Sequence, residues 1–318
     1  MGKKIITQIP PAKNLNLTVM NPPNCRFCHS PLATTMADLG ISTAPHLPPT
    51  SNIGAKAPRF KALHVYICDS CFLVQAPNHR FDQPFFISDD SDVTSFSRQQ
   101  RATHFTDRMI NRFGLTPDNL VIQHTCNDGD FLPDFQRANI PVLGIEPTEP
   151  PSPNPRQDDI PSIVECFGGD VAERLTSENR QADFFISNHS LNGVPDLNDF
   201  VVGIQTILKP EGIFTLEFPH LLKRMELNEA VATTPQDDLY FSLFTVEKIF
   251  AQYGLTIFDV ETLPDHGGSL RLYGRHDAHH ELAVTANVLA IRALERSAGL
   301  DKLETYQVGK LCLRWSAS

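Results

Sequence analysis

The chain has 318 residues, of which 41% are hydrophobic and 20% are charged, and its formal net charge is −10. This length favours about two domains, and the composition is that of a globular chain able to bury a core. The acidic balance and the lack of any Lys/Arg-rich run exclude the clustered cations on which nucleic-acid and anionic-membrane surfaces depend. We therefore expect neither nucleic acid nor membrane as a partner.

The start of the sequence, "MGKKIITQIPPAKN", is charged and lacks the long apolar run of a signal peptide. No stretch of about eighteen apolar residues occurs, so we expect no transmembrane helix. These two features predict a cytoplasmic location.

Two cysteine pairs follow a proline-containing arm, residues 1 to about 24. Cys25-x-x-Cys28 is followed by a Pro-rich loop, and Cys68-x-x-Cys71 lies between two short strands predicted at 64–67 and 72–74. A two-residue spacer lets both thiolates of a pair reach one tetrahedral ion, so the four thiols predict a structural Zn²⁺ site. The alternative is four reduced, unliganded thiols. His29 is expected to be a bystander.

Helical and extended patterns alternate along the rest of the chain. The spacing predicts a helix that begins near 95 and ends at Gly114, and a second over "DLNDFVVGIQTILKP" with Asp196 as its N-cap. Strands are predicted at "NLVIQHT", "IPVLGIEP", "ADFFIS", "GIFTLEF", "LTIFDVETL" and "SLRLYGRH". A helix is expected over "TVEKIFAQYG", and a last one over roughly 279–298, begun by His279 and His280. This alternation predicts a doubly wound, mostly parallel α/β sheet.

The first of these strands runs into Asn127-Asp128-Gly129, the place where a doubly wound fold binds its cofactor. Glu146 ends the next strand, 19 residues after Asn127, and suits the hydroxyls of an adenosine ribose. No G-x-G-x-x-G occurs, which disfavours NAD, whereas a site for S-adenosylmethionine (SAM) has the same layout with a looser glycine requirement. The alternative for Glu146 is an ordinary acid at a strand end.

The chain resembles the zinc-containing, SAM-dependent C-methyltransferases that methylate nucleotide-linked keto-deoxysugars. The resemblance is carried by "CRFCHSPL" with "YICDSCFLVQ", by "NDGDFL" and "VLGIEP", and by "VPDLNDFVVGIQTILKPEGIFTLEFPHLL" and "VEKIFAQYGLTIFDVETLPDHGGSLRLYGRH". It implies a Rossmann-like class I methyltransferase domain with a small N-terminal four-cysteine zinc-binding domain, SAM as cofactor and a nucleotide-sugar as the small-molecule substrate. The cofactor-binding residues it implies are Thr125, Asn127, Asp128, Gly129, Glu146, Asn188 and His189.

The cofactor loop departs from the family pattern Glu-x-Gly-Ser-Asn-Asp-Gly. Gln123 replaces the acid, Thr125 the glycine and Cys126 the serine. A β-branched residue takes space where the backbone should approach the ligand, and the lost carboxylate no longer favours a cationic cofactor. We expect weakened binding of SAM as a result.

The family reaction needs a base that removes a proton α to a ketone, and donors for the enolate oxygen. The family's Tyr-His-Glu-His run falls on residues 234–237, "TPQD", and Gly193 takes the place of a further loop histidine. His266 and Asp237 are therefore the candidate catalytic residues, although His266 could also serve only in a β-turn. The candidate substrate-binding residues complete the "HGGSLR" motif: Gly267, Gly268, Ser269 and Arg271.

The resemblance also implies a second α/β domain after the last helix, which "VGKLCLRWSAS" does not resemble. The expected division is 1–80 for the arm and zinc-binding domain, 81–300 for the methyltransferase-like domain, and 301–318 for a short tail in place of that second domain. A full-length homologue is the expected protein partner. Three hypotheses stay open: an active C-methyltransferase with a rebuilt base, a catalytically inactive homologue that acts as a binding or partner protein, and a decaying gene product. The intact core pattern and cysteine pairs weigh against the last.

Overall fold

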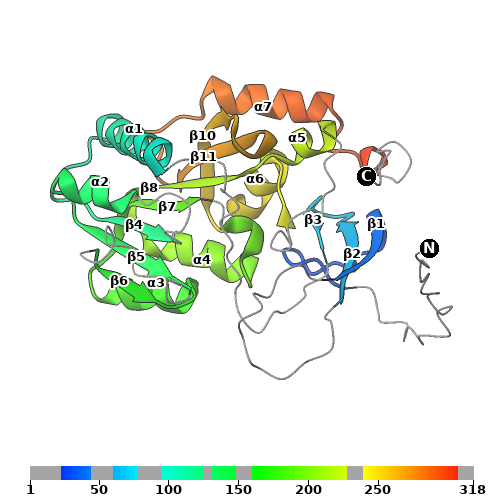
Figure 1. Cartoon of the computed structure of the whole chain (residues 1–318), viewed down its shortest axis with the longest axis horizontal. Coiled ribbons are helices and arrows are strands. Elements are labelled where there is room, and N and C mark those ends of the chain that lie inside the picture. The colour runs from blue at the N-terminus through cyan, green and yellow to red at the C-terminus, as the bar shows by residue number, and fades with distance from the viewer. Residues whose placement is uncertain are drawn as a thin grey trace, which may run out of the picture.

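The computed structural model describes residues 23–43, 60–76, 95–124, 131–147, 160–188, 190–227 and 239–306. Two β-sheets organise these residues, a four-stranded sheet near the N-terminus and a seven-stranded sheet covered by helices (Figure 1). The expected α/β class is confirmed. Within the described ranges, no helix has both the length and the apolar character needed to cross a membrane.

The small sheet is antiparallel throughout, in the order β1 (Thr34–Thr43), β2 (Phe60–Ile67), β3 (Val74–Gln75) and β9 (Leu239–Tyr240). The predicted pair of strands around the second cysteine pair is confirmed by β2 and β3. Strand β1 corrects the expectation of a loop at this place. Strand β9 comes from far along the chain and pairs with β3, so it attaches the small sheet to the larger part of the molecule.

The large sheet has the order β10-β11-β8-β7-β4-β5-β6. Its strands are β4 (Val121–His124), β5 (Val142–Glu146), β6 (Ser162–Val164), β7 (Ala182–Asn188), β8 (Leu208–Pro219), β10 (Leu255–Leu263) and β11 (Ser269–His276). Strands β6, β5, β4, β7 and β8 are parallel neighbours, and β11 is antiparallel to both β8 and β10. The chain builds outward from β4 to β6 and then returns to add β7 on the other side of β4. Ligands bind at such a reversal, beyond the carboxyl ends of the strands.

Helices cover both faces of this sheet because successive strand residues point to opposite sides and both sides are apolar. Val121 and Phe184 belong to the core under α1 (Ser95–Phe113) and α2 (Leu132–Arg137). Their neighbours Ile122 and Phe185 belong to the core on the other face. That face is covered by α3 (Gly169–Ser177), α4 (Leu197–Ile207) and α6 (Leu243–Ala251), and Figure 1 shows α3 and α4 across the sheet from α1 and α2.

Two predicted helix ends are confirmed. The carboxylate of Asp196 accepts hydrogen bonds from the N–H groups of Asn198 and Asp199, both at 3.0 Å, and so caps α4. Gly114 follows α1 with φ of 63°, the left-handed conformation in which glycine commonly ends a helix. The short helix α5 (Leu221–Glu226) follows β8.

The start predicted for the last helix was wrong. Helix α7 runs over Ala286–Ser297, so His279 and His280 lie in the turn before it. The side chain of Arg275 explains the difference, because its guanidinium donates to the carbonyl oxygens of His276 at 2.7 Å and Leu282 at 2.8 Å. These bonds fix the segment in an irregular conformation that the helical spacing of its sequence does not reveal.

Candidate functional site

The four cysteines predicted as metal ligands lie together. Their Sγ atoms are all within 4.8 Å of one another, with Cys25 at 3.5 Å from Cys71 and Cys28 at 3.4 Å from Cys68. Four thiolates about 2.3 Å from one Zn²⁺ in a tetrahedron lie about 3.8 Å apart, which these separations match. The donor set and its spacing therefore fit a structural zinc ion.

Both cysteine pairs are built on the same backbone turn. The residues that follow the pairs, His29 and Phe72, are left-handed, with φ of 60° and 67°. Each donates its N–H to the carbonyl of the first cysteine of its pair, at 3.0 Å to Cys25 and 2.9 Å to Cys68. This repeat gives the two pairs equivalent geometry, as expected of two halves of one tetrahedral site.

The protein environment favours a negative charge on Cys25 within the cluster, whereas burial raises the pKa of Cys68 to about 11. A hydrogen bond from Cys71 lowers the pKa of the Cys25 thiol to about 4, although burial opposes this shift. The same hydrogen bond raises the pKa of Cys71, as does burial. Gln75 adds a donor, with Nε2 at 3.2 Å from the Sγ of Cys25. A divalent cation would neutralise this buried charge.

Three polar residues end neighbouring strands of the large sheet, where the strand order reverses. They are His124 on β4, Glu146 on β5 and Asn188 on β7. His124 pairs with Ile145, so Glu146 lies one residue beyond that pair at the carboxyl edge. All three side chains are largely buried. Seven further predicted site residues lie outside the described positions, the last by its side chain only: Thr125, Asn127, Asp128, Gly129, His189, Asp237 and His266.

His124 forms a buried polar cluster that joins β4 to β7. Its Nδ1 lies 3.2 Å from the hydroxyls of both Ser187 and Ser190, which are hydrogen-bonded to each other. Its ring packs near Phe167 and Phe200, with centroids 5.6 Å and 5.4 Å away. Burial lowers the pKa of His124 to about 3, so the ring is neutral near pH 7. Nothing in the sequence pairs this histidine with the two serines, because their proximity depends on the strand register.

Two asparagines present buried carbonyl oxygens at the same edge. The Oδ1 atoms of Asn188 and of Asn192, in the turn Leu191–Gly193, have no hydrogen-bond partner among the residues that the structure describes. A buried acceptor without a partner costs about 1–3 kcal/mol. These two oxygens are therefore suited to a donor from a ligand or a water molecule. Asn192 was not predicted, although it precedes the position that a family histidine would occupy.

The first three residues of the "HGGSLR" motif lie in the tight turn between β10 and β11, and the last three begin β11. Gly267 and Gly268 have φ of 74° and 123°, and the carbonyl of Gly268 accepts from the N–H of His220 at 3.0 Å. A Cβ at Gly268 would lie 2.9 Å from Cγ of Lys223. The turn therefore needs glycine for both conformation and space. His266 belongs to the same turn, Asp265–Gly267.

Arg271 lies in a row of charged residues across three strands, opposite Glu217 on β8 and Glu261 on β10. Its Nε and Nη2 are 3.0 Å and 2.9 Å from Oε2 of Glu217, and its Nη1 is 3.5 Å from Oε2 of Glu261. Burial alone would lower the pKa of Arg271, but the two carboxylates raise it. Ser269 is likewise bonded inside the turn, to the carbonyl of Asp265 at 3.0 Å. Asn188, on β7, pairs with Glu217 and so continues the row onto a fourth strand.

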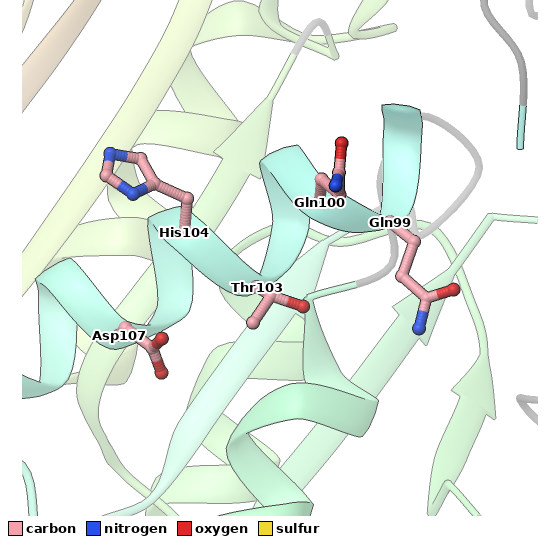
Figure 2. Close-up of a pocket in the computed structure, with 5 residues that line it drawn as sticks. All are labelled: Gln99, Gln100, Thr103, His104 and Asp107. Atoms are coloured by element: carbon pink, nitrogen blue, oxygen red, sulfur yellow. The ribbon is translucent and has the colours of Figure 1, made fainter. Parts of the chain in front are cut away.

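A polar depression lies along the middle of α1. It is lined by Gln99, Gln100, Thr103, His104 and Asp107, whose side chains Figure 2 shows on successive turns of the helix. None of them is a predicted site residue. Arg101, on the same helix, pairs with Asp265 of the glycine turn at 2.8 Å. Helix α1 is thus attached to the turn that carries His266.

Family models identify the class of protein that this fold defines. Residues 97–260 match a model described as a methyltransferase domain, and residues 264–309 match one described as a C-methyltransferase C-terminal domain. The first match covers more than half of the chain, which therefore belongs to the methyltransferase domain family. The expected Rossmann-like methyltransferase fold is confirmed.

Individual proteins give more distant similarities. The C-methyltransferase NovU of Streptomyces niveus is 27% identical over 251 residues, and the match covers 77% of this chain and 58% of the length of NovU. The magnesium protoporphyrin IX methyltransferase ChlM of Synechocystis PCC 6803 is 15% identical, with a TM-score of 0.42 over 58% of this chain and 89% of ChlM. The 1,6-didemethyltoxoflavin-N1-methyltransferase of Burkholderia thailandensis is 16% identical, with a TM-score of 0.43 over 67% of this chain and 98% of that one.

Proposed function

We propose that the chain is a SAM-dependent C-methyltransferase that acts on a nucleotide-linked keto-deoxysugar through an enolate. The observation that carries this proposal is the match to a methyltransferase domain followed directly by a match to a C-methyltransferase C-terminal domain. The similarity to NovU, a C-methyltransferase, supports the same reaction type. The substrate class comes from the resemblance of the sequence motifs to those of the sugar C-methyltransferases.

We place SAM at the carboxyl edge where β4, β5 and β7 end. The carboxylate of Glu146 would accept hydrogen bonds from the ribose hydroxyls, as an acid at the end of the second strand does in doubly wound folds. The carbonyl oxygen of Asn188 would accept a donor such as an ammonium group. Contacts from Thr125, Asn127, Asp128, Gly129 and His189 remain predictions.

The reaction exchanges a proton for a methyl group. A base of this chain would remove the proton α to the ketone, and SAM, when bound, would supply the methyl group that bonds to that carbon in its place. His266 and Asp237 are the proposed recipients of the proton. His124 is unsuited to that task, because its pKa of about 3 is far from the range of an effective base near pH 7.

We also propose that Cys25, Cys28, Cys68 and Cys71 hold a structural Zn²⁺. Four thiolates fill a tetrahedral ion and leave no position for water or substrate, so this metal would take no part in the chemistry. The division into 1–80, 81–300 and 301–318, and a full-length homologue as partner, belong to the same proposal.

A second candidate is a catalytically inactive homologue that binds SAM or a sugar nucleotide. The observation that favours it is the surroundings of Arg271, whose three guanidinium nitrogens already face the carboxylates of Glu217 and Glu261. A substrate phosphate would have to compete with both acids for this side chain.

The two candidates differ in proton abstraction, which can be followed without the cofactor. We expect an active enzyme to exchange the α-proton of a nucleotide-linked keto-deoxysugar with D₂O, observed by NMR, and to release the C-methylated product once SAM is added. His266→Ala or Asp237→Asn should slow both steps, since a general base contributes about 10²–10⁴-fold. Binding of SAM without exchange or product would favour the inactive homologue.

A further inference from the structure

Arg26 lies between the two ligands of the first cysteine pair, but its side chain contacts a different part of the molecule. Its Nη2 donates to the carbonyl of Val194 and, at 3.2 Å, to that of Pro195. Both carbonyls directly follow the turn that contains Asn192 and Gly193, beyond the carboxyl end of β7. A residue between two cysteines of the cluster thus contacts a segment at the candidate cofactor edge.

The main chain of Arg26 is fixed on the metal side. Its N–H donates to Oε1 of Gln75 at 2.9 Å, and Nε2 of the same glutamine donates to Sγ of Cys25 at 3.2 Å. A second bond reinforces the connection, because Nδ2 of Asn198 at the start of α4 donates to the carbonyl of Phe27 at 3.0 Å. The first cysteine pair is therefore attached to the segment 194–198 by both side chain and backbone.

The second cysteine pair contacts another element. The carbonyl of Phe72, next to Cys71, accepts a hydrogen bond from Oγ1 of Thr245 at 3.3 Å, at the start of α6. An ion held by all four thiols would fix the two pairs relative to each other. It would thereby fix the segment after β7 relative to the start of α6.

We propose that Arg26 is a positioning residue that couples metal binding at the four cysteines to the loop 190–198. The inference rests on the proposed function only where it assigns this loop to the cofactor site. The coupling itself follows from contacts. A planar guanidinium can present its donors to two successive carbonyls from a fixed orientation, whereas an ammonium acts as a single point charge.

The test uses full-length, metal-loaded protein and hydrogen–deuterium exchange of peptides that cover residues 190–198. Arg26→Met removes the donors but keeps an apolar stem, and Arg292→Met, which breaks an exposed ion pair with Glu247, is the matched control. We expect unchanged metal content, about fivefold to tenfold faster exchange at 190–198 in Arg26→Met, and an intermediate rate in Arg26→Lys. Arg292→Met should exchange there like the wild type.

A cycle with the metal separates coupling from simple loss of stability. Chelation should speed exchange at 190–198 in the wild type by a larger factor than in Arg26→Met, where only the bond from Asn198 to the carbonyl of Phe27 still connects the cysteine pair to this segment. Four outcomes would each overturn the proposal. Exchange at 190–198 could be unchanged in Arg26→Met, or this variant could lose its metal. Chelation could speed exchange by the same factor in Arg26→Met as in the wild type, or exchange in Arg26→Met could be faster by an equal factor throughout the sheet. If exchange responds as expected while the wild type fails to bind SAM, the coupling stands and the proposed function fails.

Discussion

The carboxylate of Glu295 in α7 lies 2.8 Å from Nε2 of His220, and both side chains are buried. The same carboxylate accepts from the N–H groups of Leu243 at 2.7 Å and Phe244 at 2.8 Å, the first two residues of α6. It therefore caps α6 from another helix. The N–H of His220 donates to the carbonyl of Gly268 in the candidate substrate turn. Glu295 therefore connects α7, α6 and, through His220, this turn.

Replacement of Glu295 by alanine should strongly destabilise the fold. It would leave the donors of His220, Leu243 and Phe244 without their acceptor, and each buried donor that loses its partner costs about 1–3 kcal/mol. Urea unfolding would measure the change. The control is Glu247→Ala, which breaks the pair of Glu247 with Arg292 on the surface and should cost about 1 kcal/mol or less. Equal effects of the two substitutions would contradict this role of Glu295.

Gly268→Ala should destabilise the protein more than Gly254→Ala. Both glycines have positive φ, but a Cβ at Gly268 would lie 2.9 Å from Lys223, whereas one at Gly254 meets no atom within 4 Å. Backbone strain alone costs about 1–2 kcal/mol, and the close contact adds to it at Gly268. A comparison of the two midpoints in thermal unfolding tests this. A midpoint for Gly268→Ala equal to or above that of Gly254→Ala would mean that the turn tolerates the side chain.

Cys25→Ser should abolish stoichiometric zinc, because a hydroxyl is a poor replacement for a thiolate in a site made of four cysteines. Metal analysis of the purified protein measures this directly. The matched control is Cys166→Ser, whose thiol is exposed and outside the cluster, and which should retain the wild-type metal content. Wild-type protein purified without bound zinc, and unaffected in stability by chelation, would remove the basis for a metal site.

The stability of the fold should depend on pH through His124. Its folded pKa of about 3 is below the ordinary value of 6.5, so between these values the unfolded chain binds a proton that the folded chain does not. Stability is then lost as pH falls from 6.5 toward 3, by about 2 kcal/mol at pH 5 from this residue. Urea unfolding of the wild type and of His124→Gln at pH 7.5 and pH 5 isolates the contribution. The same loss in both proteins would show that His124 is not responsible.

Much of the fold could be predicted because its strands and helices carry local signals. Apolar runs predicted β4, β5, β7 and β8, and Asp196 predicted the start of α4. These signals are local, because a buried strand and a helix cap each depend on only a few consecutive residues. The strand β1 and the true start of α7 depend on partners that lie outside the segments themselves. Strand β1 is stabilised by pairing with β2, and the segment before α7 by Arg275.

In the candidate site, too, local features could be predicted from the sequence, whereas contacts between distant residues could not. The spacing of Cys25, Cys28, Cys68 and Cys71 was enough to group them, because each pair is a local turn. Arg271 was predicted to bind substrate, but the sequence could not show that strand register places Glu217 and Glu261 beside it. The clusters around His124 and Glu295 likewise join residues more than fifty positions apart. Such contacts require the sheet order, which no local pattern encodes.

Calorimetric titration of the zinc-loaded protein with SAM tests the central claim most directly, namely that the carboxyl edge of β4, β5 and β7 holds this cofactor. We expect binding with a dissociation constant in the micromolar range, weakened about tenfold or more in Glu146→Ala, where the acceptor for the ribose is lost. No binding by the wild type at millimolar SAM would contradict this claim and would exclude methyl transfer by this chain alone.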